Sequence, residues 1–343
     1  MGQPNLRPLG RLRSLRGSIL SAGYAFPPSA VYKSVSSLKY LQRSQQTIAR
    51  PVSVAGFGYW SGRDVTIEFR PANPDTGIVF VRHDLPKLPR IPAQVKYRVE
   101  VPRRTVLTKG NACVEMVEHV LAALAGLRID NCEIWLNNPE LPGCDGSSSA
   151  FVEALDQAGI LEQNAPRGFL VVTEPMRVAD GDAWIEAWPV TQPELVLHCK
   201  LDYGIDHIIG RQTFKLKVTP RTFRAELATS RTFIMKSEAD WLRNQGLGTR
   251  TSQRDLLVFD EIHGPLDNTL RFDDECVRHK TLDMVGDLAL AGSDLVGRFV
   301  AYRSGHKLNA TMVRALLAEA RHIRPDAQRP GCTGGQVPWR HSA

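Results

Sequence analysis

An imidazole and two carboxylates recur at four-residue intervals in the segment RHKTLDMVGD, as His279, Asp283 and Asp287. The segment contains no proline and mixes apolar with polar residues, which predicts a helix whose i and i+4 positions share one face. A histidine and an aspartate on one helix face can bind a zinc ion, since zinc accepts imidazole nitrogen and carboxylate oxygen. The same spacing is typical of local ion pairs on solvated helix faces, so a metal site needs a third ligand from elsewhere.

A candidate for that third ligand is His119, which follows Glu118 in the segment VEMVEHVLAALAGL. Val117, Val120 and Leu124 recur at helical spacing there, so the pair is expected on a helix. Catalytic zinc keeps three protein ligands and one water, and a neighbouring glutamate can take the proton of that water. A surface histidine beside a salt-bridged glutamate explains the pair equally well on spacing alone.

A third histidine, His306, follows a glycine in the segment YRSGHKLN. The glycine predicts a turn that could direct the imidazole into a cleft, whereas a histidine that caps a helix is the structural alternative. Arg303 and Lys307 flank this histidine and suit an anionic ligand.

The elements that must position these residues are short strands and helices in two successive sets. Strands are expected around paired glycines from residue 47 to 71 and again at 132–138, and a linker at 162–169. Further strands are expected from 169 to about 218. Helices are expected at 114–127, 147–160, 237–246, 274–292 and 310–321. Because strands and helices do not alternate strictly, an α+β fold is favoured over a doubly wound sheet.

Charge and cysteine usage exclude several classes of protein. The net charge is +7, but residues 1–50 hold eight Lys or Arg and no acid, which leaves 35 bases against 36 acids in the rest. A general nucleic-acid-binding surface is therefore not expected. The six cysteines form no CxxC pair, which argues against disulfide frameworks and cysteine zinc knuckles and favours a reducing compartment. No apolar run is long enough for a transmembrane helix.

Both ends differ in composition from the rest of the chain. Residues 1–45 are rich in Arg, Ser, Pro and Gly, which predicts a basic, disordered extension. An organelle transit peptide has the same composition, and a start codon assigned too far upstream would also produce such a segment. Residues 325–343 are expected to be a loose tail.

Taken together, these segments resemble the UDP-3-O-acyl-N-acetylglucosamine deacetylase family, the zinc enzymes of lipid A biosynthesis. The resemblance extends from about Thr47 to Ala318 and lies in an ordered set of motifs rather than in any one of them. The matching segments are TIARPVSVAGFGYWSG, RPANPDTGIVFVRHDL, VEHVLAALAGLRIDN, PELPGCDGSSSAFVEAL, SRTF, LRFDDECVRHKTLDMVGDLALAG and AYRSGHKLN.

The resemblance implies an α+β fold of two similar two-layer sheet/helix sandwich domains, at 46–165 and 168–324, with the active site between them. It implies that His119, His279 and Asp283 are the zinc ligands, and that Glu118 is the general base. Iron(II) stays open as an alternative metal, because it accepts the same ligand types.

The remaining site residues follow from the same resemblance. His306 matches the acid that protonates the leaving amine, Asp287 the carboxylate that orients it, and Thr232 the residue that stabilises the oxyanion. The substrate-binding positions are matched by two cations near the diphosphate, an aromatic residue that can stack on uracil, and the phenylalanine of SRTF. These residues are Lys280, Arg303, Tyr203 and Phe233.

The implied activity is zinc-dependent hydrolysis of the acetamide of UDP-3-O-(3-hydroxyacyl)-N-acetylglucosamine, which yields acetate and is the committed step of lipid A biosynthesis. Two alternatives stay open, namely a non-catalytic paralogue that binds nucleotide sugars and a zinc amidohydrolase with a related substrate. A cytoplasmic monomer whose partner is the UDP-linked sugar is expected, with an organelle as the alternative location.

The chain departs from the family pattern at three places. Trp60 stands where histidine is common, Arg250-Thr251 replaces a glycine pair, and Lys307 follows the proposed acid. Trp60 removes any role that the family's histidine has at this position, without affecting the zinc ligands, and Arg250-Thr251 leaves the acyl-chain preference open. The charge of Lys307 could either lower the pKa of His306 or assist diphosphate binding.

Overall fold

The computed structural model describes residues 41–324, so the predicted tail and most of the predicted N-terminal extension lie outside the described residues. The last five residues of that extension are folded. Leu41 is buried, and the guanidinium of Arg43 bonds to the carboxylates of Asp130 and Asp294 at 2.6–2.7 Å.

The N-terminal half is built on a five-stranded sheet in the order β2-β3-β9-β4-β5. Along β3, Val65, Ile67 and Phe69 are buried and alternate with more exposed residues, as expected when helices cover one face of a sheet. The strands are β2 (Val52–Phe57), β3 (Asp64–Pro71), β4 (Ile78–Arg82), β5 (Arg90–Pro92) and β9 (Cys132–Leu136). A small sheet holds β6 (Arg98–Val99), β7 (Val106–Lys109) and β8 (Ala112–Glu115), after the 3-10 turn η2 (Val95–Tyr97); the helices are α1 (Glu118–Gly126) and α2 (Ser149–Ala158).

The C-terminal half is built on a seven-stranded sheet, in which β19 pairs with β11, β13 and β14. Its strands are β11 (Phe169–Val171), β12 (Met176–Asp180), β13 (Ala183–Trp188), β14 (Leu195–Asp202), β15 (Arg211–Lys217), β19 (Asp294–Tyr302) and β20 (Arg321–Ile323). The helices are α3 (Pro220–Glu226), α5 (Glu275–Leu288) and α6 (His306–Glu319), with the 3-10 turn η3 (Ala289–Ala291) after α5. An insertion carries β16 (Phe233–Met235), α4 (Lys236–Asn244), β17 (Leu257–Asp260) and β18 (Gly264–Pro265).

The segment expected as a linker contains a strand. Strand β10 (Ile160–Pro166) pairs antiparallel with β1 (Ser44–Ile48), so its polar residues are ordered by main-chain hydrogen bonds rather than by apolar burial. The side chain of Gln163 also takes part, donating to the carbonyl of Ala72 at 2.8 Å. Division of the chain into domains at 46–165 and 168–324 stays a prediction.

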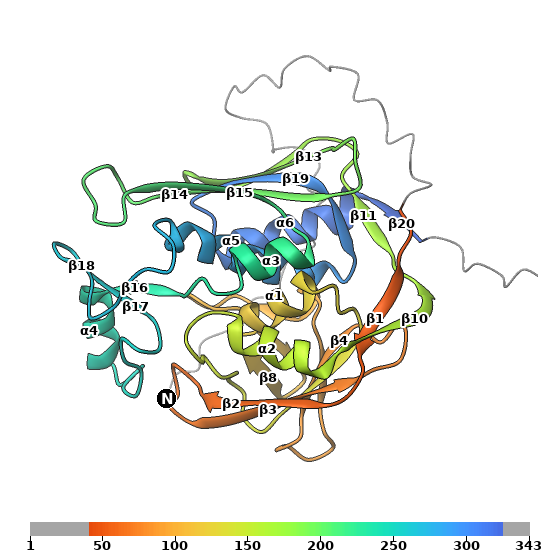
Figure 1. The fold of residues 1–343 in the computed structure, drawn as a ribbon, viewed down its shortest axis with the longest axis horizontal. Coiled ribbons are helices and arrows are strands. Elements are labelled where there is room, and N and C mark those ends of the chain that lie inside the picture. The colour runs from red at the N-terminus through yellow and green to blue at the C-terminus, as the bar shows by residue number, and fades with distance from the viewer. Residues whose placement is uncertain (1–40, 325–343) are drawn as a thin grey trace, which may run out of the picture. The chain divides into compact units, whose positions relative to one another are not determined.

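All the labelled helices except α4 lie between the two large sheets, whereas α4 lies beside β16, β17 and β18 (Figure 1). The sheet that contains β2 and β3 is followed by α1 and α2, then by α5 and α6, and then by the sheet that contains β14 and β19. One hydrophobic core includes residues of both sheets and of the helices between them. The predicted α+β class is therefore confirmed.

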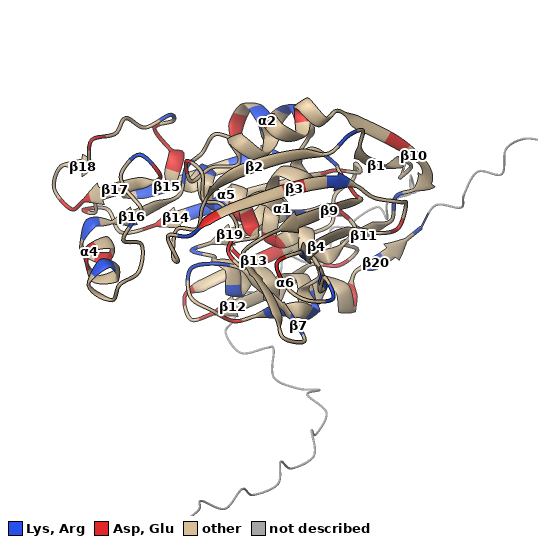
Figure 2. Ribbon diagram, turned by 90° about the horizontal axis from the view of Figure 1, so that it is seen from below, with Lys and Arg blue, Asp and Glu red and all other residues tan. Residues whose placement is uncertain are grey.

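The charged residues and the cysteines of the described part are arranged as the composition predicts. Figure 2 shows acidic and basic residues interspersed over the elements on the side that it presents. The cysteines within residues 41–324 are free thiols. No helix within these residues is both long and apolar enough to cross a membrane.

Candidate active site

The site is organised where α1 lies against α5, and a glycine makes this close approach possible. A β-carbon added to Gly286 on α5 would lie 2.0 Å from the carbonyl oxygen of Glu118 on α1. Only a residue without a side chain fits at that distance. The contact brings the first turn of α1, with Glu118 and His119, against the middle of α5, with His279 and Asp283.

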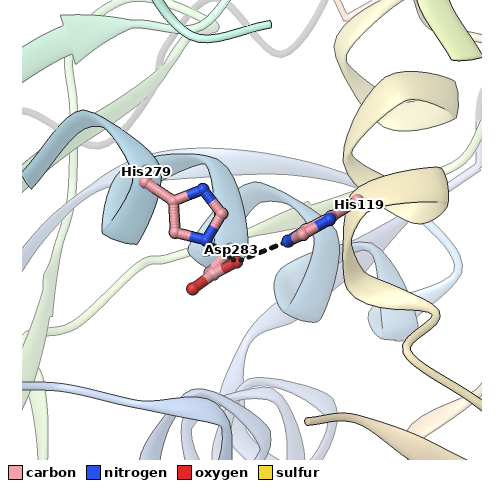
Figure 3. Close-up of side chains that lie close together, drawn as sticks. All are labelled: His119, His279 and Asp283. Atoms are coloured by element: carbon pink, nitrogen blue, oxygen red, sulfur yellow. Dashed lines mark ion pairs between the residues drawn. The ribbon is translucent and has the colours of Figure 1, made fainter. Parts of the chain in front are cut away.

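His119, His279 and Asp283 come together although about 160 residues separate the first from the second (Figure 3). Asp283 lies between the two imidazoles, with its Oδ1 at 3.5 Å from Nε2 of His119 and at 3.3 Å from Nε2 of His279. All three residues are buried. In a tetrahedral site with bonds near 2.05 Å, neighbouring ligand atoms stand about 3.3 Å apart, so both spacings fit a shared zinc ion.

The donor atoms themselves fit a cation. Oδ1 of Asp283 is buried and has no hydrogen-bond partner among the described residues. Nδ1 of His279 lies 3.1 Å from the carbonyl oxygen of Ser230, to which it can donate, which leaves Nε2 with a free lone pair. Burial lowers the pKa of His279 to about 3, so its imidazole is neutral, as a metal ligand must be.

Asp283 is held in its ionised form. Burial opposes its ionisation, but the electrostatic interactions with the His279 imidazole and with the ammonium of Lys280 hold the pKa of the carboxyl well below its usual range. Nζ of Lys280 donates to Oδ2 at 3.0 Å. One oxygen of Asp283 is therefore paired with a lysine, and the other is left for a cation.

Glu118 and His306 face each other beside these three residues. Oε1 of Glu118 lies 4.0 Å from Nε2 of His306. Burial raises the pKa of Glu118, although His306 and His119 oppose this. Burial works to lower the pKa of His306, but the charge and hydrogen bond of Asp287, supported by Glu118, outweigh it and raise that pKa to about 9. At neutral pH His306 is thus a cation that can donate a proton.

Asp287 holds His306 in place through a bonded network at the far side of the imidazole. Nδ1 of His306 donates to Oδ2 of Asp287 at 2.8 Å, and Nδ2 of Asn309 donates to the same oxygen at 2.8 Å. The hydroxyl of Thr105 donates to Oδ1 at 2.6 Å. Both oxygens of this fully buried carboxylate are therefore bonded.

A cavity of about 750 Å³ opens beside this cluster, a volume typical of ligand sites. Its walls include the three candidate metal ligands together with Glu118 and His306. Another part of the wall is apolar and comes mainly from the insertion, with Ile234, Leu242, Leu247, Leu256 and Val258.

The structure also brings the predicted oxyanion-stabilising residue, Thr232, and the predicted substrate-binding residues to this cavity. Thr232, Phe233, Tyr203, Lys280 and Arg303 all line it. The ring of Phe233 packs edge-to-face against the rings of His279 and Tyr203. Its centroid lies 6.4 Å from that of His279 and 6.2 Å from that of Tyr203. Arg303 is exposed and has a positive φ of 51°, a conformation that non-glycine residues adopt rarely and often at functional sites.

The departure Arg250-Thr251 connects the insertion to the turn between β2 and β3, and the departure Trp60 lies in that turn. Arg250 donates to Oδ1 of Asp64 at 2.6 Å and lies over the ring of Phe57. The hydroxyl of Thr251 donates to the carbonyl of Tyr59 at 3.1 Å. Trp60 lines the cavity and stacks under the guanidinium of Arg104.

The third departure, Lys307, has partners of its own. Its Nζ lies 2.9 Å from Oδ2 of Asp180 and 3.7 Å from Oε1 of Glu100. The ammonium of Lys307 is therefore paired with carboxylates at the rim of the site. Both effects considered for Lys307 stay predictions.

Sequence reasoning missed Thr105, Asn309 and Ser230 as parts of the site. Asn309 lies one turn after His306 on α6, a spacing that could have drawn attention to it. Thr105 and Ser230 lie outside any helix, in irregular segments, so no periodicity marks them.

Comparisons with known proteins agree on one family. The family model of UDP-3-O-acyl N-acetylglycosamine deacetylase (LpxC) matches residues 45–318. A protein of Myxococcus xanthus named UDP-3-O-acyl-N-acetylglucosamine deacetylase is 38% identical over 277 residues, which cover 80% of this chain and 87% of that protein. Proteins of the same name from Haemophilus influenzae and Brucella ovis are 39% identical over 280 residues, which cover 80% of this chain and 90% and 96% of theirs.

Proposed function

This chain belongs to the UDP-3-O-acyl-N-acetylglucosamine deacetylase family, and on this premise we propose that it hydrolyses the acetamide of UDP-3-O-(3-hydroxyacyl)-N-acetylglucosamine. The products would be acetate and the free amine, in the committed step of lipid A biosynthesis. The observation that carries the proposal is that three buried metal-ligand candidates, a carboxylate base and a cationic histidine all line one cavity.

His119, His279 and Asp283 would hold the metal ion, which we propose to be zinc, with iron(II) as the alternative. When bound, zinc would polarise the amide carbonyl and make a water more acidic. The ligand set is one that catalytic zinc commonly uses, with three protein ligands and room for a water on the cavity side.

Glu118 would take the proton of the attacking water, since its carboxylate lines the cavity and lies next in sequence to His119. Burial raises its pKa, which makes its carboxylate a stronger base than that of an exposed glutamate. The hydroxyl or main chain of Thr232, at the same wall, would stabilise the negative oxygen that develops during attack.

His306 would protonate the departing amine. An amine leaves poorly unless it receives a proton, and a histidine with a pKa of about 9 carries that proton at neutral pH. Asp287 does not line the cavity and would act by orienting His306 and by stabilising its charged form.

The rest of the cavity suits the remaining parts of the substrate. Lys280 and Arg303 would attract the diphosphate, while Tyr203 would stack on uracil and Phe233 would pack beside the sugar. The apolar wall of Leu242, Leu247 and Val258 would take the acyl chain. A UDP-linked substrate of this kind is water-soluble at its nucleotide end, and we propose the bacterial cytoplasm as the place of action.

The experiment is a turnover assay on purified protein, with UDP-3-O-(3-hydroxyacyl)-N-acetylglucosamine of several acyl lengths as substrates. Release of acetate and of the free amine in equal amounts is the expected result. Tight binding of the substrate without acetate release at any acyl length, from folded and metal-loaded protein, would contradict the proposal and favour a binding-only role.

A further inference from the structure

We propose that Thr105, which no part of the mechanism above uses, is a positioning residue that fixes the distance between the base Glu118 and the acid His306. This inference rests on the proposed function. Thr105 is fully buried and does not line the cavity, so it cannot touch the substrate. Its effect would be transmitted through the two carboxylates that it bonds.

Thr105 closes a ring of four residues. Its main-chain N–H donates to Oε2 of Glu118 at 3.0 Å, and its hydroxyl donates to Oδ1 of Asp287 at 2.6 Å. Asp287 accepts from Nδ1 of His306 at 2.8 Å through its other oxygen. The ring is completed where Nε2 of His306 faces Oε1 of Glu118 at 4.0 Å. One oxygen of each carboxylate is therefore held by Thr105, while the other oxygen lies toward His306.

Thr105 joins elements that are distant in sequence. It lies just before β7, whereas Asp287 lies near the end of α5. Its carbonyl accepts from the main-chain N–H of Val117, the residue that precedes α1, at 3.4 Å. Thr105 is thus bonded to the residue that precedes α1, to the proposed base Glu118 and to Asp287, the carboxylate that orients His306.

The two oxygens of Asp287 are not held equally. His306 and Asn309 both donate to Oδ2, whereas within residues 41–324 Thr105 is the hydrogen-bond donor to Oδ1. Without the hydroxyl, the buried Oδ1 would lack a partner, and the carboxylate could relieve this by rotating. Because Nδ1 of His306 is bonded to the same carboxylate, the rotation would move the acid relative to Glu118.

The substitution Thr105→Val removes the hydroxyl and keeps both the side-chain shape and the main-chain bond to Glu118. We expect kcat to fall by about 10–100-fold, the usual effect of losing one hydrogen bond to a charged group, with KM changed by less than about 2-fold. Thr105→Ser restores the hydroxyl and should recover kcat to within about 3-fold of the wild type. Thr108→Val, on β7 three residues later, is the matched control that should leave kcat unchanged.

Zinc content and the midpoint of unfolding are measured for every variant, so that loss of metal or of fold is recognised. The NMR signal of the His306 Nδ1 proton provides a reading that needs no turnover: it should shift in Thr105→Val and return in Thr105→Ser. If the wild type releases no acetate, the proposed function fails, and this signal still decides the inference. A kcat within 2-fold of wild type in Thr105→Val together with an unmoved signal, or no recovery in Thr105→Ser, would overturn it.

Discussion

The buried cluster between α1 and α5 and the rim of the cavity differ in how firmly their side chains are held. In the cluster, Glu118, His119, His279, Asp283 and Asp287 are at most 5% exposed, and hydrogen bonds or close neighbours fix their orientation. On the rim, Tyr203 is 42% exposed, and Arg303 and Lys307 are exposed as well.

This difference indicates a division of work. Reacting groups must be held in place before the substrate arrives, and burial is also what shifts their pKa values. In the proposed function, rim residues would contact the large flexible parts of the substrate, and their exposed side chains are free to adjust to it. Substitutions in the cluster should therefore change kcat strongly, whereas those on the rim should change KM weakly.

The largest expected effect comes from the base. Glu118→Gln keeps the size of the side chain and its bond with the N–H of Thr105 but removes the ability to accept a proton, so kcat should fall by about 10²–10⁴-fold. The measurement is acetate release at saturating substrate, with zinc content as the control. Near-wild-type turnover in this variant would remove Glu118 from the mechanism.

The next effect concerns pH. As the proposed acid, His306 would have to be protonated, so kcat/KM should fall as the pH rises through its pKa of about 9. The negative charge of Asp287 is the main cause that raises the pKa of His306 from 6.5. Asp287→Asn removes this charge but leaves the burial that lowers the pKa, so the alkaline limb should move to lower pH by roughly two units. An alkaline limb at the same pH in both proteins would show that another group is responsible.

The helix contact should respond in stability. Gly286→Ala places a methyl group where the carbonyl oxygen of Glu118 lies, so α1 and α5 must separate. We expect a loss of about 1–3 kcal/mol in the free energy of unfolding, together with lower activity. Gly168→Ala is the matched control, because its added β-carbon would meet other atoms only at 3.7 Å or more. Equal stability of Gly286→Ala and wild type would mean that the helices do not need this contact.

The smallest effect is expected on the rim. Lys307→Ala removes an exposed ion pair with Asp180, and exposed ion pairs contribute little, so KM should change by no more than about 5-fold and kcat should stay the same. Lys307→Arg keeps the charge and should behave as wild type. A large loss of kcat in Lys307→Ala would contradict the division between cluster and rim.

The periodicity of α5 could be predicted from the sequence, because residues four apart on a helix share a face whatever packs against it. That His119 lies beside His279 could not be predicted from their spacing in the sequence, since it depends on tertiary packing and on the close contact at Gly286. Only the resemblance of ordered motifs indicated it. The hydroxyl of Thr105 has no pattern that marks it, because its partners lie on other elements.

Strand β10 and Lys307 also show that sequence patterns do not reveal the partners that a residue contacts across the fold. The polar residues of β10 suggest a linker, yet pairing with β1 orders them. For Lys307, nothing in the sequence indicated its ion pair with Asp180, because the two residues lie far apart in the chain. Local patterns predict elements and faces, whereas partners across the fold are set by packing.

The most direct test of the central claim is removal and return of the metal. Purified protein is assayed for acetate release from UDP-3-O-(3-hydroxyacyl)-N-acetylglucosamine before and after treatment with a chelator, and again after addition of zinc or iron(II). The account predicts that the chelator abolishes release, that a low zinc concentration restores it, and that His279→Ala binds no metal and is not restored. Full activity in protein shown to be free of metal would contradict the account.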